Sequence, residues 1–171
     1  MIDLNQFIRN IPDFPKPGIQ FKDITPLLAS PDAFHSAIEA MATPFRDRHV
    51  DKVVGIEARG FLFAAPIAIA LGTGVVPIRK PGKLPFRSIR HTYALEYGSD
   101  TIEIHEDAVT QGERILLVDD VLATGGTIRA ACDLIEKLGG NIVGVSFLSE
   151  LSFLDGRKKI GGYETHSLLV F

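Results

Sequence analysis

The segment from Ile115 to Thr127, ILLVDDVLATGGT, contains the residues best suited to binding and chemistry. Its apolar start is typical of a buried strand, and apolar residues at helical spacing follow it from Ile128. At the mouth of a helix, backbone N–H groups have no intrahelical partners and the helix dipole favours an anion. The segment therefore predicts a phosphate cradle. The cradle consists of Ala123 to Thr127, whose backbone N–H groups can donate to a phosphate. Gly125 and Gly126 permit the phosphate to approach closely, and the hydroxyls of Thr124 and Thr127 are further donors.

Two adjacent acids, Asp119 and Asp120, lie between this predicted strand and the cradle. Neighbouring side chains of a regular strand face opposite ways, so both acids reach one ligand only if the strand ends near Val118 and the chain bends. Ionised carboxylates accept hydrogen bonds and could hold a vicinal diol. A phosphate cradle beside a diol clamp describes a ribose 5-phosphate site. The alternative is a plain helix cap with two solvated acids after a buried strand.

Two βαβ units are expected to position these residues. Short β-branched runs alternate with stretches of helical period, which is typical of a mostly parallel sheet with right-handed crossover helices. The first unit consists of a strand at Val53–Ile56, a helix at Arg59–Leu71 and a strand at Val75–Ile78. The second unit begins with a strand at Arg114–Val118 and ends with a strand at Asn141–Phe147. The helix between them has an apolar face formed by Ile128, Ala131, Cys132, Ile135 and Leu138.

Two segments interrupt this alternation. Residues Asn10–Leu28 are rich in proline and are expected to form an irregular but ordered arm before a helix at about Pro31–Arg48. Residues Lys80–Tyr93 show no periodicity, which in a folded domain favours a functional lid. The strand patterns Thr92–Glu96 and Asp100–Ile104 then predict a hairpin at the end of that lid.

Composition narrows the functional classes. The 171 residues indicate one domain, and 18 basic against 21 acidic residues give a net charge of −3, which argues against a general nucleic-acid binder. The apolar run Phe61–Leu71 is too short to span a bilayer, and the first ten residues lack a secretory pattern, so no membrane partner is expected. The lone Cys132 fits a reducing compartment, and the cytoplasm is the expected location.

The ILLVDDVLATGGT segment resembles the phosphoribosyl pyrophosphate signature of type I phosphoribosyltransferases, and further segments resemble the adenine-specific members of that family. The resemblance implies an α/β fold with a five-stranded, mostly parallel sheet flanked by helices, a hood at residues 1–30 and a lid at residues 80–104. It also implies transfer of a phosphoribosyl group to adenine, giving AMP and pyrophosphate. The further segments are IPDFPKPGIQFKDITPLL (11–28), GIEARGFLFAAPIA (55–68), RKPGKLP (79–85), YALEYGSDTIEIHEDA (93–108) and ELSFLDGRKKI (150–160).

The same resemblance implies roles for individual residues around the sugar and the leaving group. The 5-phosphate is expected on Ala123–Thr127, and the ribose hydroxyls are expected on Asp119 and Asp120. The segment Glu57-Ala58-Arg59 matches the family's pyrophosphate loop, in which a non-proline cis peptide is expected between Glu57 and Ala58. Positive charge for the leaving pyrophosphate would come from Arg79, Lys80 and Lys83.

For the base, the resemblance implies stacking on Phe21, recognition by backbone groups of Ile19, Gln20 and Phe21, closure by Leu151 and a further contact with Arg59. It assigns no role to Lys22, where some members carry arginine. The expected catalytic residue is Glu96, beside Tyr97, as a general base or as a stabiliser of the developing cation. Mg²⁺ is expected to be held mainly by substrate oxygens and water rather than by a protein metal site, and a homodimer is expected.

Two alternatives remain open from the sequence. The phosphate and ribose motif does not name the acceptor, so a phosphoribosyltransferase for guanine, hypoxanthine or another base has the same signature. The fold could also serve as a non-catalytic regulator that senses phosphoribosyl pyrophosphate. Such a regulator should have a basic nucleic-acid face or an added helix-turn-helix domain, and a chain of 171 residues with net charge −3 leaves little room for either.

Overall fold

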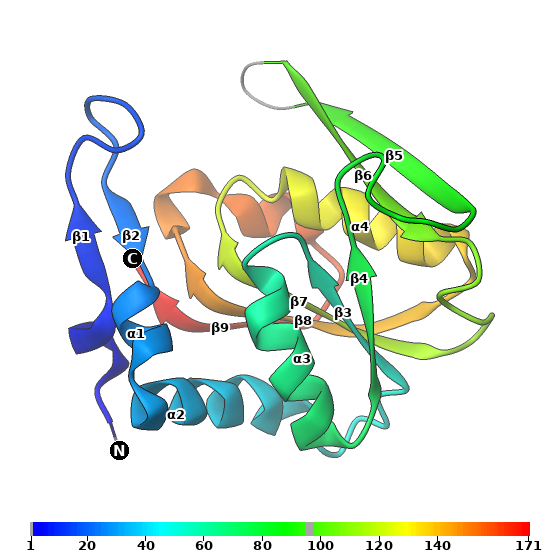
Figure 1. Ribbon diagram of the computed structural model, residues 1–171, viewed down its shortest axis with the longest axis horizontal. Helices are drawn as coiled ribbons and strands as arrows, with labels where there is room; N and C mark the ends of the chain where they lie inside the picture. The colour runs from blue at the N-terminus through cyan, green and yellow to red at the C-terminus, as the bar shows by residue number, and fades with distance from the viewer. Residues whose placement is uncertain (1, 95–97) are drawn as a thin grey trace.

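A five-stranded parallel sheet forms the centre of the computed structural model, which describes residues 2–94 and 98–171 (Figure 1). The strand order is β4-β3-β7-β8-β9, and each neighbouring pair is parallel. The predicted parallel sheet is therefore confirmed. Its strands are β3 (Lys52–Ile56), β4 (Gly74–Ile78), β7 (Arg114–Leu122), β8 (Asn141–Glu150) and β9 (Thr165–Val170).

Helices cover both faces of this sheet. Helices α2 (Pro31–Ala42) and α3 (Gly60–Leu71) pack on one face, and α4 (Gly126–Lys137) packs on the other. Successive strand residues alternate between the two layers, so Val53 joins the core under α3 whereas Val54 joins the core under α4. None of the described helices is both long enough and apolar enough to cross a bilayer.

The strand order reverses next to β3. The crossover through α3 leads from β3 to β4 on one side, whereas β7 pairs with the other side of β3 and the crossover through α4 continues to β8. Both predicted βαβ units are confirmed. In open parallel sheets, ligands bind outside the carboxyl ends of the strands at such a reversal. The loops after β3 and β7 are therefore expected to flank a site.

The N-terminal arm is more regular than the sequence indicates. Antiparallel strands β1 (Arg9–Ile11) and β2 (Phe21–Asp23) form a hairpin, and helix α1 (Thr25–Ala29) follows. The expectation of an irregular arm was wrong because three-residue strands are too short to show alternation. In Figure 1 the hairpin, in blue, stands beside the chain's C-terminus and away from β4.

Three element boundaries also differ from the prediction. Helix α2 ends at Ala42 and not near Arg48, because Pro44 has no N–H to continue it and a 3₁₀ helix, Thr43–Phe45, follows. The hairpin at the lid consists of β5 (Ser88–Ala94) and β6 (Ser99–His105), so the first strand begins earlier than predicted. Strand β7 continues four residues beyond Val118, which places both predicted ribose-binding acids within the strand.

Burial at the centre of β8 generates a stability prediction. Phe147 is fully buried under α4, so Phe147→Ala should lower the free energy of unfolding by about 3–5 kcal/mol. Phe153 is 72% exposed, and Phe153→Ala should cost less than about 0.5 kcal/mol. Urea unfolding of both variants and the wild type measures these losses, provided that the free energy of unfolding falls with urea at the same slope in all three proteins. Equal losses from the two variants would contradict the assignment of Phe147 to the core.

Candidate active site

The predicted phosphate cradle forms a pocket between β7 and α4. The pocket has a volume of about 150 Å³, and Ala123 to Thr127 line it together with Asp119. Gly125 has a φ of 77°, in the left-handed region, and a Cβ atom there would collide with the carbonyl oxygen of Gly156. The 3₁₀ helix Gly156–Ile160 therefore packs against the loop, and only glycine fits at position 125.

The two acids of β7 point into different pockets. Because β7 remains extended to Leu122, Asp119 lines the phosphate pocket, whereas Asp120 lines a neighbouring pocket of about 100 Å³. The expectation that the strand ends at Val118 was wrong, and no bend turns both side chains the same way. The backbone N–H of Asp120 donates to Oδ1 of Asp119 at 2.9 Å, so the two residues stay linked at the boundary between the pockets.

Burial and mutual repulsion change the acidity of these carboxyls. Burial is the largest influence on Asp119 and raises its pKa well above the usual value, and the charge of Asp120 raises it further. Burial also raises the pKa of Asp120, although the Arg59 guanidinium opposes that rise. Arg59 Nε lies 2.8 Å from Oδ2 of Asp120. A cationic or hydrogen-bonding ligand near Asp119 would favour its ionised form.

The second pocket gathers all five residues predicted to contact a base. Its lining includes Ile19, Gln20, Phe21, Arg59 and Leu151. The Arg59 guanidinium carbon lies 5.4 Å from the centre of the Phe21 ring, and the Phe14 ring meets the same ring edge-on with a centroid distance of 5.1 Å. The hairpin β1–β2 thus supplies one wall, and the ends of β7 and β8 supply the other.

Sequence reasoning missed four further residues of this pocket, which are Lys22, Ile24, Val121 and Ser149. Val121 and Ser149 are cross-strand partners in β7 and β8, so correct strand ends would have placed them together. Lys22 contacts the C-terminal residue as well, with Nζ 4.0 Å from the centre of the Phe171 ring. The resemblance singled out Lys22 only as a position where some members carry arginine, and it assigned no role to the other three.

The predicted pyrophosphate loop follows β3 and contains the expected cis peptide between Glu57 and Ala58. The Glu57 carboxylate contacts three basic residues that follow β4. It pairs with Lys83 and lies 3.4 Å from Arg79 Nε. It also accepts a 2.9 Å hydrogen bond from the Lys80 backbone N–H. Burial would raise the Glu57 pKa, but these hydrogen bonds and charges together hold it below its usual value. The side chains of Arg79 and Lys83 thus meet at one carboxylate, whereas Lys80 reaches it only through its backbone N–H.

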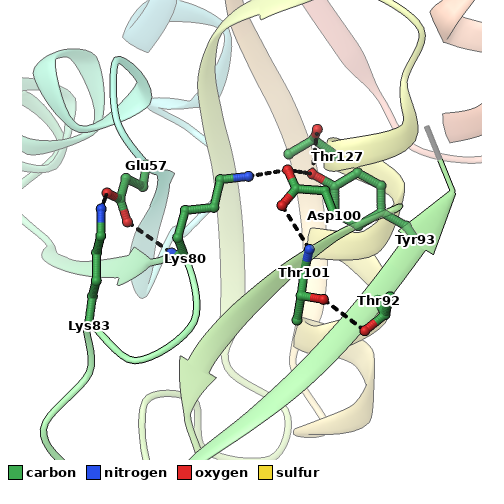
Figure 2. Close-up of polar contacts among 8 residues, drawn as sticks. All are labelled: Glu57, Lys80, Lys83, Thr92, Tyr93, Asp100, Thr101 and Thr127. Carbon is green, nitrogen blue, oxygen red and sulfur yellow. Dashed lines mark hydrogen bonds and ion pairs between the residues drawn. The ribbon is translucent and has the colours of Figure 1, made fainter. Parts of the chain in front are cut away.

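A polar network joins this cluster to the phosphate loop (Figure 2). The Lys80 ammonium group pairs with Oδ2 of Asp100, and the Tyr93 hydroxyl donates to the same oxygen at 3.1 Å. The Tyr93 oxygen lies 2.9 Å from the Thr127 hydroxyl, which is then the donor because the Tyr93 proton is used. Burial would raise the Asp100 pKa, but the hydrogen bonds from Lys80, Thr101 and Tyr93 and the Lys80 charge hold it below its usual value.

One predicted residue has no described position. Glu96, the expected catalytic residue, lies outside the described residues, as do Leu95 and Tyr97. Among the residues that the structure does describe, no group of three or more histidine, cysteine or acidic side chains is arranged to hold a metal ion. The described part of the chain therefore places the predicted phosphate loop, the predicted base-contacting residues and the predicted cations at one edge of the sheet.

Known proteins are similar to this chain over nearly its whole length. Residues 23–152 match the family described as Phosphoribosyl transferase domain. A protein of Myxococcus xanthus (strain DK1622), named adenine phosphoribosyltransferase, is 60% identical over 99% of this chain and 92% of its own length. The crystal structure of the Thermoanaerobacter pseudethanolicus ATCC 33223 adenine phosphoribosyltransferase has a TM-score of 0.95 at 55% identity, covering 98% of both chains.

A third relative was solved with ligands. The Saccharomyces cerevisiae adenine phosphoribosyltransferase, complexed with an imino-altritol bisphosphate and adenine, has a TM-score of 0.91 at 41% identity and covers 96% of both chains. Identity at this level over nearly the full length goes beyond a shared fold. On the strength of the domain match, the sequence relatives and the sheet with its signature loop, this chain belongs to the phosphoribosyltransferase family and, within it, to the adenine phosphoribosyltransferases.

Proposed function

We propose that this protein transfers the phosphoribosyl group of 5-phosphoribosyl 1-pyrophosphate to adenine, releasing AMP and pyrophosphate. The observation that carries the proposal is the contiguity of three subsites at the carboxyl edge of the sheet: the Ala123–Thr127 loop, the Phe21 pocket and the cations around Glu57. Asp119 and Asp120 lie between the first two, where a ribose would join a 5-phosphate to a base. The adenine bound to the yeast relative supports the choice of acceptor.

The reaction breaks the bond from ribose C1 to a pyrophosphate oxygen and forms a bond from C1 to an adenine nitrogen, which loses its proton. Positive charge develops on the sugar while negative charge gathers on the leaving group. Arg79, Lys80 and Lys83 would stabilise the leaving group, since preorganised cations act where charge develops. Glu96 would accept the proton or stabilise the sugar cation.

Recognition of adenine is assigned to the backbone around Phe21. The ring offers a stacking face to any purine, so stacking on Phe21 alone does not select among bases. Phe21 is paired with Ile11 of β1, and the Ile19 backbone is held by hydrogen bonds with Phe14 and Lys16, so the backbone from Ile19 to Phe21 has a fixed position. A site built to hydrogen-bond one edge pattern rejects a base with the opposite pattern, since the buried groups would be left unpaired.

Mg²⁺ is proposed as the accompanying ion. Carboxylate and phosphate oxygens are the ligands that it prefers, and Asp119 and Asp120 supply carboxylates beside the phosphate loop. When bound, the ion would offset the charge of the pyrophosphate group. The substrate would supply most of its ligands, because Asp120 is already paired with Arg59 and Glu57 with Lys83.

The cytoplasm is proposed as the compartment on the basis of the cysteine. Cys132 is fully buried in α4, and burial raises the pKa of its thiol to about 12. The thiol therefore stays protonated and unreactive, as suits a protein of a reducing compartment.

The function is tested by supplying adenine, hypoxanthine or guanine with phosphoribosyl pyrophosphate and Mg²⁺ and separating the nucleotides formed. AMP from adenine alone is expected, and chelation of Mg²⁺ with EDTA should abolish its formation. IMP or GMP as the main product would instead establish a phosphoribosyltransferase for another purine. Binding of phosphoribosyl pyrophosphate without reaction of any base would favour the regulator.

The role of Glu96 is tested with Glu96→Gln. Loss of the carboxylate should lower kcat by about 10²- to 10⁴-fold while the KM values for both substrates change little, because the residue acts in the transition state. Glu164→Gln is the matched control: Glu164 pairs with Arg48 before β9 begins, at the amino-terminal edge of the sheet, and its loss should leave kcat unchanged. An unaltered kcat in Glu96→Gln would exclude the assigned role.

A homodimer is proposed on the apolar surface of α3. This helix is apolar nearly all round, with Ile69 81% exposed and Leu62 45% exposed, and a helix of that kind is normally buried. Ile69→Glu should convert the dimer to a monomer in light scattering coupled to gel filtration. Val170→Glu, at the opposite edge of the sheet and 60% exposed, should leave the mass unchanged. A monomeric wild-type protein would refute the proposal.

A further inference from the structure

The network in Figure 2 leaves Asp100 without a part in the reaction, although this residue lies between two of the proposed subsites. On one side its carboxylate pairs with Lys80, one of the cations assigned to pyrophosphate. On the other side it accepts a hydrogen bond from Tyr93, which contacts Thr127 of the phosphate loop. A carboxylate that occupies a phosphate-binding cation competes with the phosphate for it.

The Asp100 carboxylate is held firmly. Asp100 is the cross-strand partner of Tyr93 in the β5–β6 hairpin, and Tyr93 is buried in the core under α4. One carboxylate oxygen accepts the 3.1 Å bond from Tyr93, and the other accepts a 2.8 Å bond from the Thr101 backbone N–H. The ring of Tyr93 also lies against Gly126, where an added Cβ atom would be 3.5 Å from Cδ2. The acid therefore has a fixed position.

Lys80 is the adjustable partner of this pair. Its backbone is fixed because its N–H donates to Glu57, but its side chain is 36% exposed and carries the ammonium group at the end of a flexible four-carbon stem. Rotation of that stem can transfer the ammonium group from Asp100 to an incoming anion without moving the backbone. A diphosphate carries more negative charge than one carboxylate and so competes effectively for the cation.

We propose that Asp100 is a positioning residue that holds the Lys80 ammonium group while pyrophosphate is absent, and that pyrophosphate binds Lys80 only by displacing this carboxylate. The inference rests on the proposed function, because it takes pyrophosphate as the ligand of Lys80. The exchange makes no covalent bond. Its consequence is that Asp100 weakens the binding of pyrophosphate, both as part of the substrate and as the product that must leave.

The test uses Asp100→Asn, which keeps the shape of the side chain and removes its charge. The Kd for inorganic pyrophosphate with Mg²⁺, measured by calorimetry, should fall by about three- to tenfold, and the KM for phosphoribosyl pyrophosphate should fall with it. The KM for adenine should stay unchanged, because the base pocket does not contain Asp100. A general loosening of the fold would weaken the binding of both substrates, so it would not lower the KM for phosphoribosyl pyrophosphate while leaving the KM for adenine unchanged.

Lys80→Met supplies the matched control. In that background Asp100→Asn should change the pyrophosphate Kd by less than about twofold, since the cation for which the carboxylate competes is gone. Asp100→Ser should lower the pyrophosphate Kd as Asp100→Asn does. It replaces Asp100→Asn in the test if the asparagine variant folds poorly. Unchanged or weaker pyrophosphate binding in both Asp100 variants, with a wild-type protein that binds it, would overturn this inference alone. A wild-type protein that binds no pyrophosphate would overturn the proposed function as well.

Discussion

Parallel pairing of all five central strands is the constraint on which the site depends. It brings five carboxyl ends to one edge, and the reversal of strand order beside β3 separates the loops after β3 and β7 enough to admit a ligand. Residues 62 positions apart, such as Arg59 and Val121, therefore line the same pocket. Both faces of the sheet are covered by apolar layers.

The alternation of β7 gives the adjacent acids separate tasks. Asp119 lines the pocket at Ala123–Thr127 and Asp120 lines the pocket at Phe21, so one strand end contributes to two neighbouring pockets. Arg59, which follows β3, also makes two contacts: it pairs with Asp120 and lies near the Phe21 ring. Close packing fixes the relation between the parts: the Gly125 backbone touches Gly156, which leaves the loop no freedom to shift without moving the helix behind it.

Much of this could be predicted because it depends on local pattern. The βαβ units follow from apolar periods, and the phosphate loop follows from a glycine-rich turn between strand and helix. What could not be predicted depends on pairing over distance. The hairpin β1–β2 has three-residue strands held by their partners, and β7 continues past Val118 because β8 lies beside it. Asp100 meets Lys80 because a bridge between Arg79 and Glu103 places the end of β4 beside β6. No single-sequence period encodes such partners.

The carboxylates around the site also affect which anions can occupy it. Arg59, Lys80 and Lys83 are each held by an acid of the same chain. A singly charged ion, such as chloride or a carboxylate metabolite, gains no more from one of these cations than the acid that it would displace. A group with several charges on adjacent phosphates contacts more than one cation at a time and overcomes this competition. In the absence of a ligand, each of these three cations is therefore already paired with a carboxylate of the chain.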